Sequence, residues 1–344
     1  MNEKTGYAII GCGVIAPWHA RSVVNVPEAE LIAVCDVIEE KAQKLAEEFG
    51  AQNVYTDYRK MLERDDIEII SVCTPSGMHA DMAIEAARAG KHVMTEKPID
   101  IRLEKIDQLI RTCKRRKVKL ACIFQRRAST LWQRVKRTVE EGRIGRMVLS
   151  SAYLKYFRSQ EYYDSAGWRG TWALDGGGAL MNQGVHMIDL LRWIMGPIDT
   201  VFAFADHLAR NIEVEDTAVA SIRFKSGALG TLEGTTSIIP GMNHRMELHG
   251  DKGTILINGE TITHWDVPGE DKEEVAKEME DRVGNSSSDP TAISTHGHQV
   301  QIADLIAAVR EGRDPMVSGA EARNAVEMIL AIYRSAQTGQ PVKL

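Results

Sequence analysis

Short apolar runs alternate with amphipathic segments along the first part of the chain. Residues 7–24 comprise a short apolar run followed by a helical segment. Further apolar runs lie at 31–36, 53–56, 67–74, 91–96 and 119–124. The segments between them have helical spacing, at 38–49, 57–63, 79–89 and 102–116. Strands that alternate with helices of this length are typical of a parallel sheet with helices on both faces. We therefore predict an α/β fold whose residues 1–124 form a doubly wound parallel sheet.

The second part of the chain has a different pattern. After a helical segment at 130–141, apolar and polar residues alternate at 147–156, 198–207, 217–224, 228–237, 244–249 and 253–258. A period of two indicates strands with one buried face, and short glycine turns indicate antiparallel neighbours. We predict an α/β domain over residues 125–344, built on an open, mostly antiparallel sheet. Its closing helix is a candidate to pack back on the first domain. Residues 259–294 are polar, and the acidic, helix-like patch at 270–282 within them is interpreted as a solvated face or flap.

A glycine pattern, Gly-x-Gly-x-x-Ala, follows the first apolar run at residues 11–16. Glycine permits a sharp turn and a close approach of backbone to a pyrophosphate, which then lies on the free N–H groups of the helix that follows. We expect a dinucleotide to contact this loop through Gly11, Cys12, Gly13, Val14 and Ile15.

Asp36 ends the next apolar run, where a carboxylate accepts hydrogen bonds from the adenosine ribose and repels a 2′-phosphate. Val37 and Ile38 follow it, and neither is a basic residue that would pair with such a phosphate. NAD is therefore favoured over NADP. The alternative for Asp36 is the N-cap of the helix that follows.

Two further segments end strands of the predicted parallel sheet, where ligands gather. Thr74, Pro75 and His79 follow one strand, and Glu96 and Lys97 follow the next, which Pro98 stops. We expect these residues to line the cofactor edge. The alternatives are a structural histidine at the helix start for His79 and a solvated surface lysine for Lys97.

A triple glycine at 176–178 precedes a helical segment with polar residues on neighbouring turns. Asn182 and His186 are four positions apart and can face one substrate, and Asp189 is a candidate to orient the imidazole. Histidine at such a place is suited to acid–base chemistry. By contrast, His296 and His298 have no acidic or cysteine ligand near them in the sequence, so we expect no metal site there.

Composition and charge limit the classes of function. The net charge of −6 and a pI near 6.0 do not favour nucleic acid or an anionic membrane as a partner. The basic run at 114–119 is interpreted as a solvated helix end. The five cysteines show no C-x-x-C spacing and are expected to be buried thiols in a reducing compartment. We find neither a signal peptide nor a membrane span, and expect a cytoplasmic protein.

The motifs GCGVIAPWHA (11–20), CTPSGMH (73–79), EKP (96–98) and GGGALMNQGVHMIDLL (176–191), with the tail 315–344, resemble the Gfo/Idh/MocA family of oxidoreductases. The resemblance implies an N-terminal Rossmann domain and a C-terminal α/β domain with an open sheet. It implies NAD-dependent oxidation of a sugar or polyol hydroxyl without a metal, and assembly into homodimers or homotetramers. It also implies that Lys97 contacts both the nicotinamide and the reacting hydroxyl.

The segment WRGTWALDGGGALMNQGVH (168–186) is most similar to the WlbA-type branch, which oxidises the 3-hydroxyl of UDP-N-acetylglucosaminuronic acid. Many family members have aspartate where this chain has Asn182, and an amide cannot be a base, which leaves Lys97 and His186 as the acid/base pair. The substrate-binding residues are then Lys97, Gln125, Arg169, Asn182 and His186. Trp168 and Arg169 would also border the cofactor, unless they form a core tryptophan with an arginine at its rim. Inositol or simple-sugar dehydrogenases and a non-catalytic NAD-sensing regulator remain as alternatives.

Overall fold

The computed structural model describes residues 4–278 and 295–344. The chain divides into two compact units. Unit 1 comprises residues 1–125 and 295–323, and unit 2 comprises residues 126–294 and 324–344. The first segment of unit 1 ends one residue beyond the boundary expected after residue 124. Residues 295–323, which follow the first segment of unit 2 in the sequence, also belong to unit 1.

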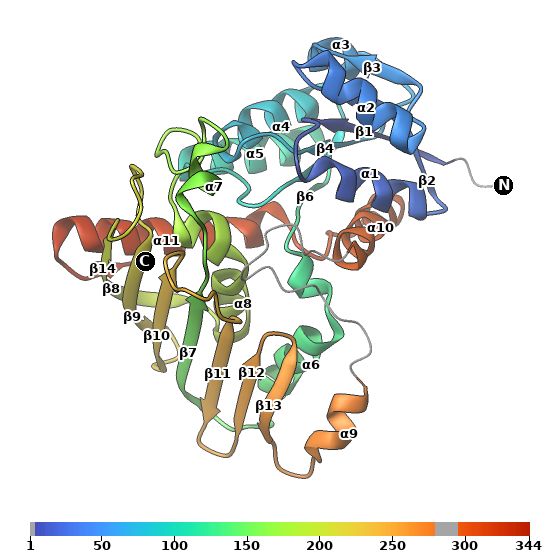
Figure 1. Ribbon diagram of the computed structural model, residues 1–344. Helices are drawn as coiled ribbons and strands as arrows, with labels where there is room; N and C mark the ends of the chain where they lie inside the picture. Colours follow the sequence, from blue (N-terminus) through green and yellow to red (C-terminus); the bar gives the residue numbers. More distant parts are fainter. Residues whose placement is uncertain (1–3, 279–294) are drawn as a thin grey trace. The chain divides into compact units, whose positions relative to one another are not determined.

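Unit 1 is a parallel sheet in the order β3-β2-β1-β4-β5-β6 (Figure 1). Its strands are β1 (Thr5–Ile10), β2 (Ala29–Cys35), β3 (Asn53–Tyr55), β4 (Ile69–Val72), β5 (His92–Thr95) and β6 (Leu120–Cys122). Its helices are α1 (Ala16–Asn25), α2 (Glu39–Phe49), α3 (Tyr58–Leu62), α4 (His79–Arg88), α5 (Leu103–Arg116) and α10 (His296–Glu311), with a 3-10 turn at Ser76–Met78. The predicted doubly wound fold is confirmed.

Helix α10 belongs to unit 1 because of its apolar face. Ile302, Leu305 and Ile306 on α10 are buried in one core cluster with Ala20 and Val23 on α1. At about 25 cal/mol per Å² of apolar surface, burying three such side chains contributes several kcal/mol. The sequence separation of these segments explains why a single cut after residue 124 does not describe unit 1.

Unit 2 is an eight-stranded sheet in the order β13-β12-β11-β7-β10-β9-β8-β14. Its neighbouring strands are antiparallel except for the parallel pair β7 and β10. The strands are β7 (Met147–Lys155), β8 (Ile198–Asp206), β9 (Thr217–Phe224), β10 (Leu229–Thr235), β11 (Arg245–Gly250), β12 (Thr254–Asn258), β13 (Thr261–Asp266) and β14 (Val342–Lys343). The mostly antiparallel sheet is therefore confirmed.

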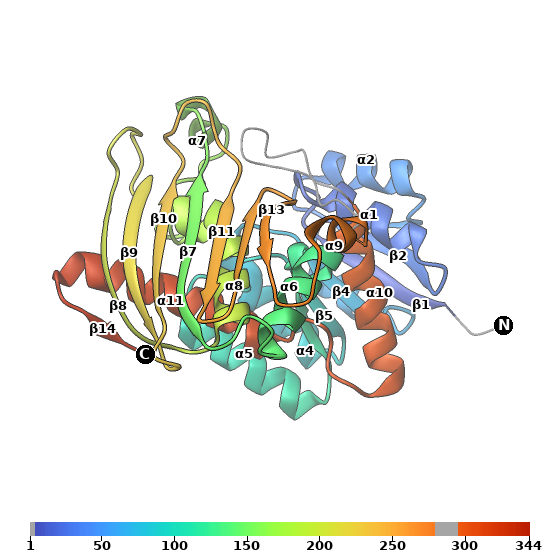
Figure 2. The same ribbon diagram turned by 90° about the horizontal axis from the view of Figure 1, so that it is seen from below.

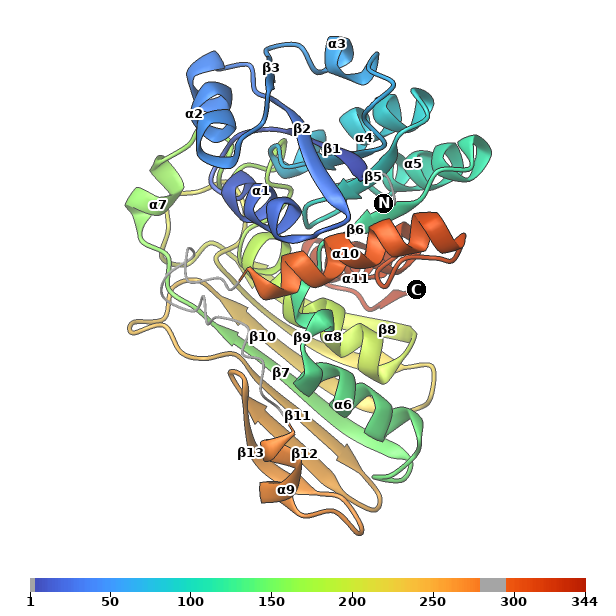
Figure 3. The ribbon, with the colours of Figure 1, turned by 90° about the vertical axis from the view of Figure 1, so that its right-hand side faces the viewer.

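Helices lie against one face of this sheet, as Figures 2 and 3 show for α6 (Thr130–Glu140) and α8 (Val185–Met195). The other helices of unit 2 are α7 (Gln160–Asp164) and α9 (Lys272–Lys277), and α11 (Gly319–Thr338) begins in unit 1 and ends in unit 2. Residues of β9 alternate between buried and exposed, so the other sheet face is open. On that face Phe204 is 66% exposed and lies opposite Val219, 44% exposed. Exposed apolar pairs of this kind suit an assembly interface, and homo-oligomerisation stays a prediction.

Within the polar stretch 259–294, residues 261–266 form strand β13, which the sequence pattern did not predict. Ile262 and Trp265 of this strand are both 6% exposed and pack on the sheet. The acidic patch includes helix α9, whose N-cap Asp271 accepts from the backbone of Glu273 and Glu274. The loop at 284–290 lies outside the described residues.

All five cysteines are buried free thiols, as predicted. Across residues 4–278 and 295–344, no helix combines the length and apolar character needed to cross a bilayer.

Candidate active site

The glycine loop of unit 1 joins the carboxyl end of β1 to α1. Gly11 has a φ of 91°, and a Cβ there would lie 2.8 Å from the Cys73 carbonyl. Gly13 is exposed, and a Cβ on it would meet no atom within 4 Å. Helix α1 starts at Ala16 without a side-chain cap or an acidic residue in its first turn. The open space at Gly13 and the start of α1 without a capping side chain together suit a pyrophosphate.

Asp36 lies at the carboxyl end of β2. One carboxylate oxygen accepts from the Cys12 N–H at 2.8 Å and the other from the Ile38 N–H at 2.9 Å. The N-cap of α2 is Ile38, so the capping alternative for Asp36 is not what the structure has. Val14, Val37 and Ile38 expose 64%, 85% and 45% of their surfaces. These apolar groups would be covered by an adenosine whose ribose binds Asp36.

Thr74, Pro75 and His79 follow β4. The Thr74 Oγ1 atom is buried and finds no hydrogen-bond partner among the described residues. His79 is 1% exposed, and its ring nitrogens lie 2.7 Å from the carbonyl oxygens of Pro98 and Thr74. His79 therefore ties together the two loops that follow β4 and β5. Direct contact of these three residues with the cofactor stays a prediction.

Glu96 follows β5 and is 5% exposed. Its Oε1 lies 2.9 Å from His19 Nε2 and 3.2 Å from His298 Nε2, and its Oε2 accepts from the Lys97 N–H at 3.0 Å. Burial by itself would raise the pKa of Glu96, but the hydrogen bonds from the two rings hold it well below its usual range. The group is a buried carboxylate directly before Lys97, which is itself half-buried.

Sequence reasoning missed the role of His19 and placed His298 in no site. The donor atoms of His19, Glu96 and His298 lie within 4.8 Å of one another, a spacing also seen around metal ions. Direct hydrogen bonds of 2.9 and 3.2 Å account for the cluster without a metal. Nearby, Gln125 is 6% exposed and lies beside α10, where a Cβ on Gly297 would be 2.6 Å from the Gln125 Cβ. Contact of Gln125 with the substrate stays a prediction.

In unit 2, the triple glycine leads into a π-helical turn (Ala179–Gly184) and then α8. Asn182, Gln183 and His186 are half-buried, whereas their neighbours Met181 and Val185 are fully buried. The segment therefore presents three polar side chains on its accessible side. π-helical turns within helices are frequent at functional sites.

The acidic neighbours of this segment have distinct partners. Asn182 Nδ2 donates to Asp175 Oδ1 at 2.7 Å, and the Gly170 N–H donates to Asp175 Oδ2 at 2.9 Å. Asp189 is 2% exposed and accepts two bonds from Arg127, at 2.8 and 2.7 Å. This bidentate pair fixes α8 and gives Asp189 a structural role, and the orientation of His186 by Asp189 stays a prediction.

Trp168 and Arg169 are half-buried beside the same segment. The Arg169 guanidinium lies 4.8 Å from the Trp168 ring centroid and 4.3 Å from that of Tyr162, whose hydroxyl it also binds. The Tyr162 hydroxyl further accepts from Gln183 Nε2 at 3.1 Å. Tyr162 thus links Arg169 to the turn that contains Asn182.

Glu215 holds the start of this turn. Its carboxylate accepts from the N–H groups of Gly178 at 2.9 Å and Leu180 at 2.8 Å and from the Tyr333 hydroxyl at 2.8 Å. Its backbone carbonyl accepts from Ala179 at 3.1 Å. Burial raises the pKa of Glu215 to about 7 although these hydrogen bonds act in the opposite direction. No sequence pattern pointed to Glu215, because it precedes β9 and lies 35 positions from Leu180.

Comparison with known proteins identifies both halves of the chain. Residues 5–124 match the model of an oxidoreductase family with an NAD-binding Rossmann fold, and residues 136–344 match its C-terminal alpha/beta domain. The chain belongs to the Gfo/Idh/MocA family. It is 35% identical to the WlbA dehydrogenase of Chromobacterium violaceum, covering 100% of this chain and 97% of that one with a TM-score of 0.91. The WlbA dehydrogenase of Bordetella pertussis is 32% identical, with 99% of each chain covered and a TM-score of 0.89.

Both WlbA structures contain NADH and UDP-GlcNAcA. Among curated proteins, the myo-inositol 2-dehydrogenase of Thermotoga maritima is 28% identical over 98% of this chain and 97% of its own length. As a Gfo/Idh/MocA member, the protein is an NAD-dependent oxidoreductase of the sugar and polyol dehydrogenase class. The open Gly13 loop, the buried Thr74 hydroxyl and the exposed apolar rim of Asp36 fit NAD at the carboxyl edge of unit 1.

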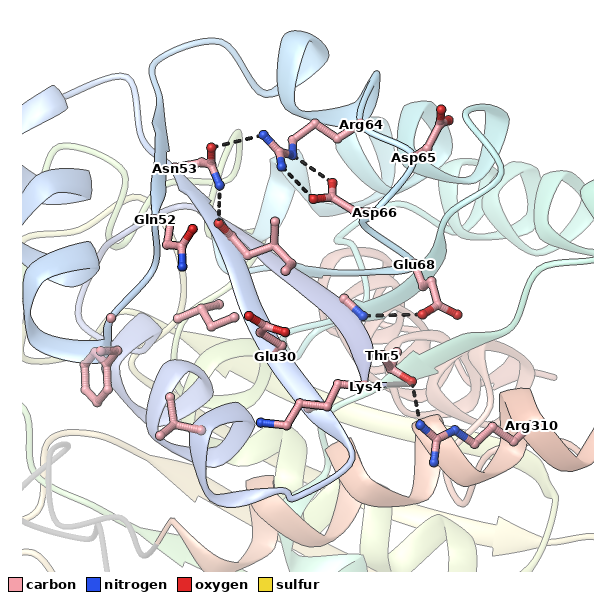
Figure 4. Close-up of a pocket in the computed structure, with 17 residues that line it drawn as sticks. Lys4, Thr5, Glu30, Gln52, Asn53, Arg64, Asp65, Asp66, Glu68 and Arg310 are labelled. Carbon is pink, nitrogen blue, oxygen red and sulfur yellow. Dashed lines mark hydrogen bonds and ion pairs between the residues drawn. The ribbon is translucent and has the colours of Figure 1, made fainter. Parts of the chain in front are cut away.

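A separate hollow of about 930 Å³ lies at the amino ends of β1 to β4, opposite the cofactor edge (Figure 4). Both arginines around it bind neighbouring side chains: Arg64 pairs with Asp66 at 2.6 Å, and Arg310 lies 3.2 Å from Thr5 Oγ1. Glu68 accepts from the Gly6 N–H. Because ligands of parallel sheets bind at the carboxyl edge, we assign no ligand to this hollow.

Proposed function

We propose that this Gfo/Idh/MocA enzyme oxidises the 3-hydroxyl of a UDP-linked N-acetylated sugar acid, as the resemblance of residues 168–186 to the WlbA branch implies. The observation that supports this substrate most directly is a pair of arginines in unit 2, Arg169 and Arg210. Among the described residues, neither pairs with a carboxylate within 4 Å. Arg210 donates instead to the Arg158 carbonyl at 2.7 Å and lies 5.4 Å from the Phe157 ring.

Such guanidinium groups favour an anionic ligand. A nucleotide sugar acid has a diphosphate and a carboxylate, both of which arginine binds in bidentate fashion. An inositol is neutral and offers hydroxyl groups only. Tyr162 connects Arg169 to Gln183, one residue after Asn182, so an anion at Arg169 would be held next to the accessible side of the turn.

The proposal gives each candidate residue a role. When bound, NAD accepts the hydride from the carbon that bears the reacting hydroxyl. An uncharged Lys97 amine takes the hydroxyl proton, and His186 is the second acid/base group. Asn182 cannot exchange protons and positions a neighbouring sugar hydroxyl.

A second candidate is an inositol dehydrogenase, favoured by the full-length match to myo-inositol 2-dehydrogenase. Both candidates need the same cofactor edge and the same acid/base pair, and they differ in the charge of the substrate. Replacement of Arg169 would therefore weaken the binding of a nucleotide sugar acid and hardly change the binding of an inositol.

The test uses UDP-N-acetylglucosaminuronic acid with deuterium at C3, incubated with the protein and NAD, with 2-oxoglutarate present to reoxidise tightly bound NADH. We expect deuterium in NADH or in 2-hydroxyglutarate, measured by mass spectrometry. Rapid transfer from myo-inositol deuterated at its reacting carbon, with none from the nucleotide sugar, would sink the nucleotide-sugar assignment and favour the second candidate.

Arg169→Gln refines the test. We expect KM for the nucleotide sugar to rise about tenfold or more, the scale of a lost bond to a charged group. The matched control is Arg59→Gln in unit 1, since Arg59 also stacks on a tyrosine, Tyr58 at 4.8 Å, but already pairs with Glu85 at 2.9 Å. Equal KM values in wild type and Arg169→Gln would remove the anion-binding role.

A further inference from the structure

Glu96 is held by residues from separate elements of unit 1. His19 lies on α1, His298 lies on α10, and Glu96 follows β5. All three are buried, with exposed fractions of 0%, 1% and 5%. A carboxylate so buried is costly unless donors satisfy its oxygens, and two imidazoles and one backbone N–H supply them here.

The contacts fix which ring nitrogen of His19 carries the proton. Its Nε2 faces the Glu96 carboxylate, an acceptor, and therefore must donate. Its Nδ1 lies 2.9 Å from Ser71 Oγ, which in turn lies 2.7 Å from the Tyr7 hydroxyl. Burial lowers the pKa of His19, so the neutral ring accepts from Ser71 at Nδ1 and donates to Glu96 at Nε2. A chain of hydrogen bonds thus runs from Tyr7 on β1 through Ser71 on β4 to Glu96.

His298, which follows Glu96 in the sequence whereas His19 precedes it, supplies the second donor. Its Nε2 lies 3.2 Å from the same Oε1 atom, and its ring is edge-on to that of His19 at 5.3 Å between centroids. The first turn of α10 is held against this region by the core cluster shared with α1. Each histidine restricts the carboxylate, and together they leave it one orientation.

That orientation matters for Lys97. Strand β5 ends at Thr95 and Pro98 cannot continue a ladder, so the N–H of Lys97 needs an acceptor outside the sheet. Glu96 Oε2 is that acceptor, at 3.0 Å. The Glu96 N–H is itself bound to the Val72 carbonyl at 3.0 Å. The backbone that projects the Lys97 side chain is therefore anchored through the carboxylate.

We propose that His19 and His298 are positioning residues for Lys97, acting through Glu96 and touching neither substrate nor cofactor. This inference rests on the proposed role of Lys97 in catalysis. It predicts that the hydrogen-bond donor at each position, rather than the imidazole as such, sustains turnover.

The test compares His298→Gln, which keeps a side-chain N–H donor, with His298→Leu, which has similar bulk without one. With the sugar or polyol that the wild-type enzyme oxidises fastest, we expect kcat to fall about tenfold to a hundredfold in His298→Leu and to stay within about threefold in His298→Gln. NADH affinity, from fluorescence titration, should stay within about threefold in both variants. Equal kcat in the two variants, or a loss confined to NADH affinity, would overturn the proposal.

A second measurement needs no substrate and so separates this inference from the proposed function. In protein with ¹⁵N-labelled histidine, assigned with His19→Gln and His298→Gln, long-range nitrogen–proton spectra at pH 7.5 report which ring nitrogens are protonated. We expect a proton on Nε2 of both rings. A bare Nε2 on either ring, or one equivalent of tightly bound metal in the purified protein, would overturn the hydrogen-bond assignment. Failure of UDP-sugar oxidation with an intact Nε2–H pattern would count against the proposed substrate alone.

Discussion

The side-chain amide of Asn182 donates to Asp175 Oδ1 over 2.7 Å. This bond fixes the amide so that Nδ2 faces Asp175. The other Asp175 oxygen binds the backbone of Gly170, so the loop after Arg169 and the π-helical turn share one carboxylate. An asparagine at position 182 supplies the hydrogen-bond donor that Asp175 Oδ1 accepts, whereas an aspartate there would bring two carboxylates into contact.

Asn182→Asp should therefore be destabilising in a pH-dependent way. Two carboxyl groups at this distance cannot both ionise, so the folded-state pKa of one of them rises above its unfolded value. The associated stability is present below the unfolded pKa and is lost as pH rises through the folded pKa. We expect Asn182→Asp to be roughly 1–3 kcal/mol less stable than wild type at pH 8 and close to wild type near pH 4.5. Urea unfolding at both pH values measures this, and exposed Asn211→Asp is the control; a loss that does not depend on pH would contradict the pairing.

Lys97→Met should lower turnover by roughly a hundredfold or more while leaving NAD affinity within a few-fold, because a proton acceptor is lost and the apolar stem is kept. Stopped-flow NADH formation and equilibrium titration give the two quantities. Lys60→Met changes an exposed lysine of α3 and should behave as wild type. Near-normal turnover in Lys97→Met would place the base elsewhere.

Glu215 links pH to the stability of unit 2. Its pKa is raised from 4.5 to about 7 by burial, so the native state binds more protons than the unfolded state between these values. The contribution of Glu215 to the free energy of unfolding then falls as pH rises from about 4.5 to 7, by up to about 1.4 kcal/mol per pH unit. Above about pH 7 this contribution is constant. Glu215→Gln removes the titration, so its destabilisation relative to wild type should be larger at pH 5 than at pH 8. Denaturant unfolding at the two pH values checks this, and a constant difference would show that Glu215 does not titrate in this range.

Cofactor preference should follow the residue pair at the end of β2. Asp36→Ser with Val37→Arg removes a repulsion and adds a phosphate partner, and Val37 is 85% exposed, so an arginine fits without repacking. We expect the ratio of NAD to NADP affinity to fall by at least tenfold. Fluorescence titration with NADH and NADPH measures it. Tighter binding of NADP than of NAD by the wild-type protein would refute the role of Asp36.

Local pattern was enough to predict the elements of unit 1 and the place of Asp36, because each strand and helix has its own period and the carboxyl edge follows from parallel pairing. It was not enough for His19, whose partner Glu96 is 77 positions away, or for α10, whose membership of unit 1 depends on a core cluster formed across the whole chain. Strand β13 was missed because its buried residues Ile262 and Trp265 are three positions apart, so the strand lacks the regular alternation of apolar and polar residues. The bond between Arg127 and Asp189 could not be predicted either, because folding brings the two residues together from 62 positions apart.

Unit 1 is built from two segments of chain, and this sets an order of events during synthesis. Glu96 leaves the ribosome 202 residues before His298, a delay of about 10–40 s at 5–20 residues per second. During that time the nascent Rossmann sheet has one of its two imidazole donors and lacks Ile302, Leu305 and Ile306 from its core. The cofactor edge is therefore completed only after residues 126–294 of unit 2 have been translated, so a chain truncated before residue 295 would have the glycine loop and Asp36 without the full anchor of Lys97.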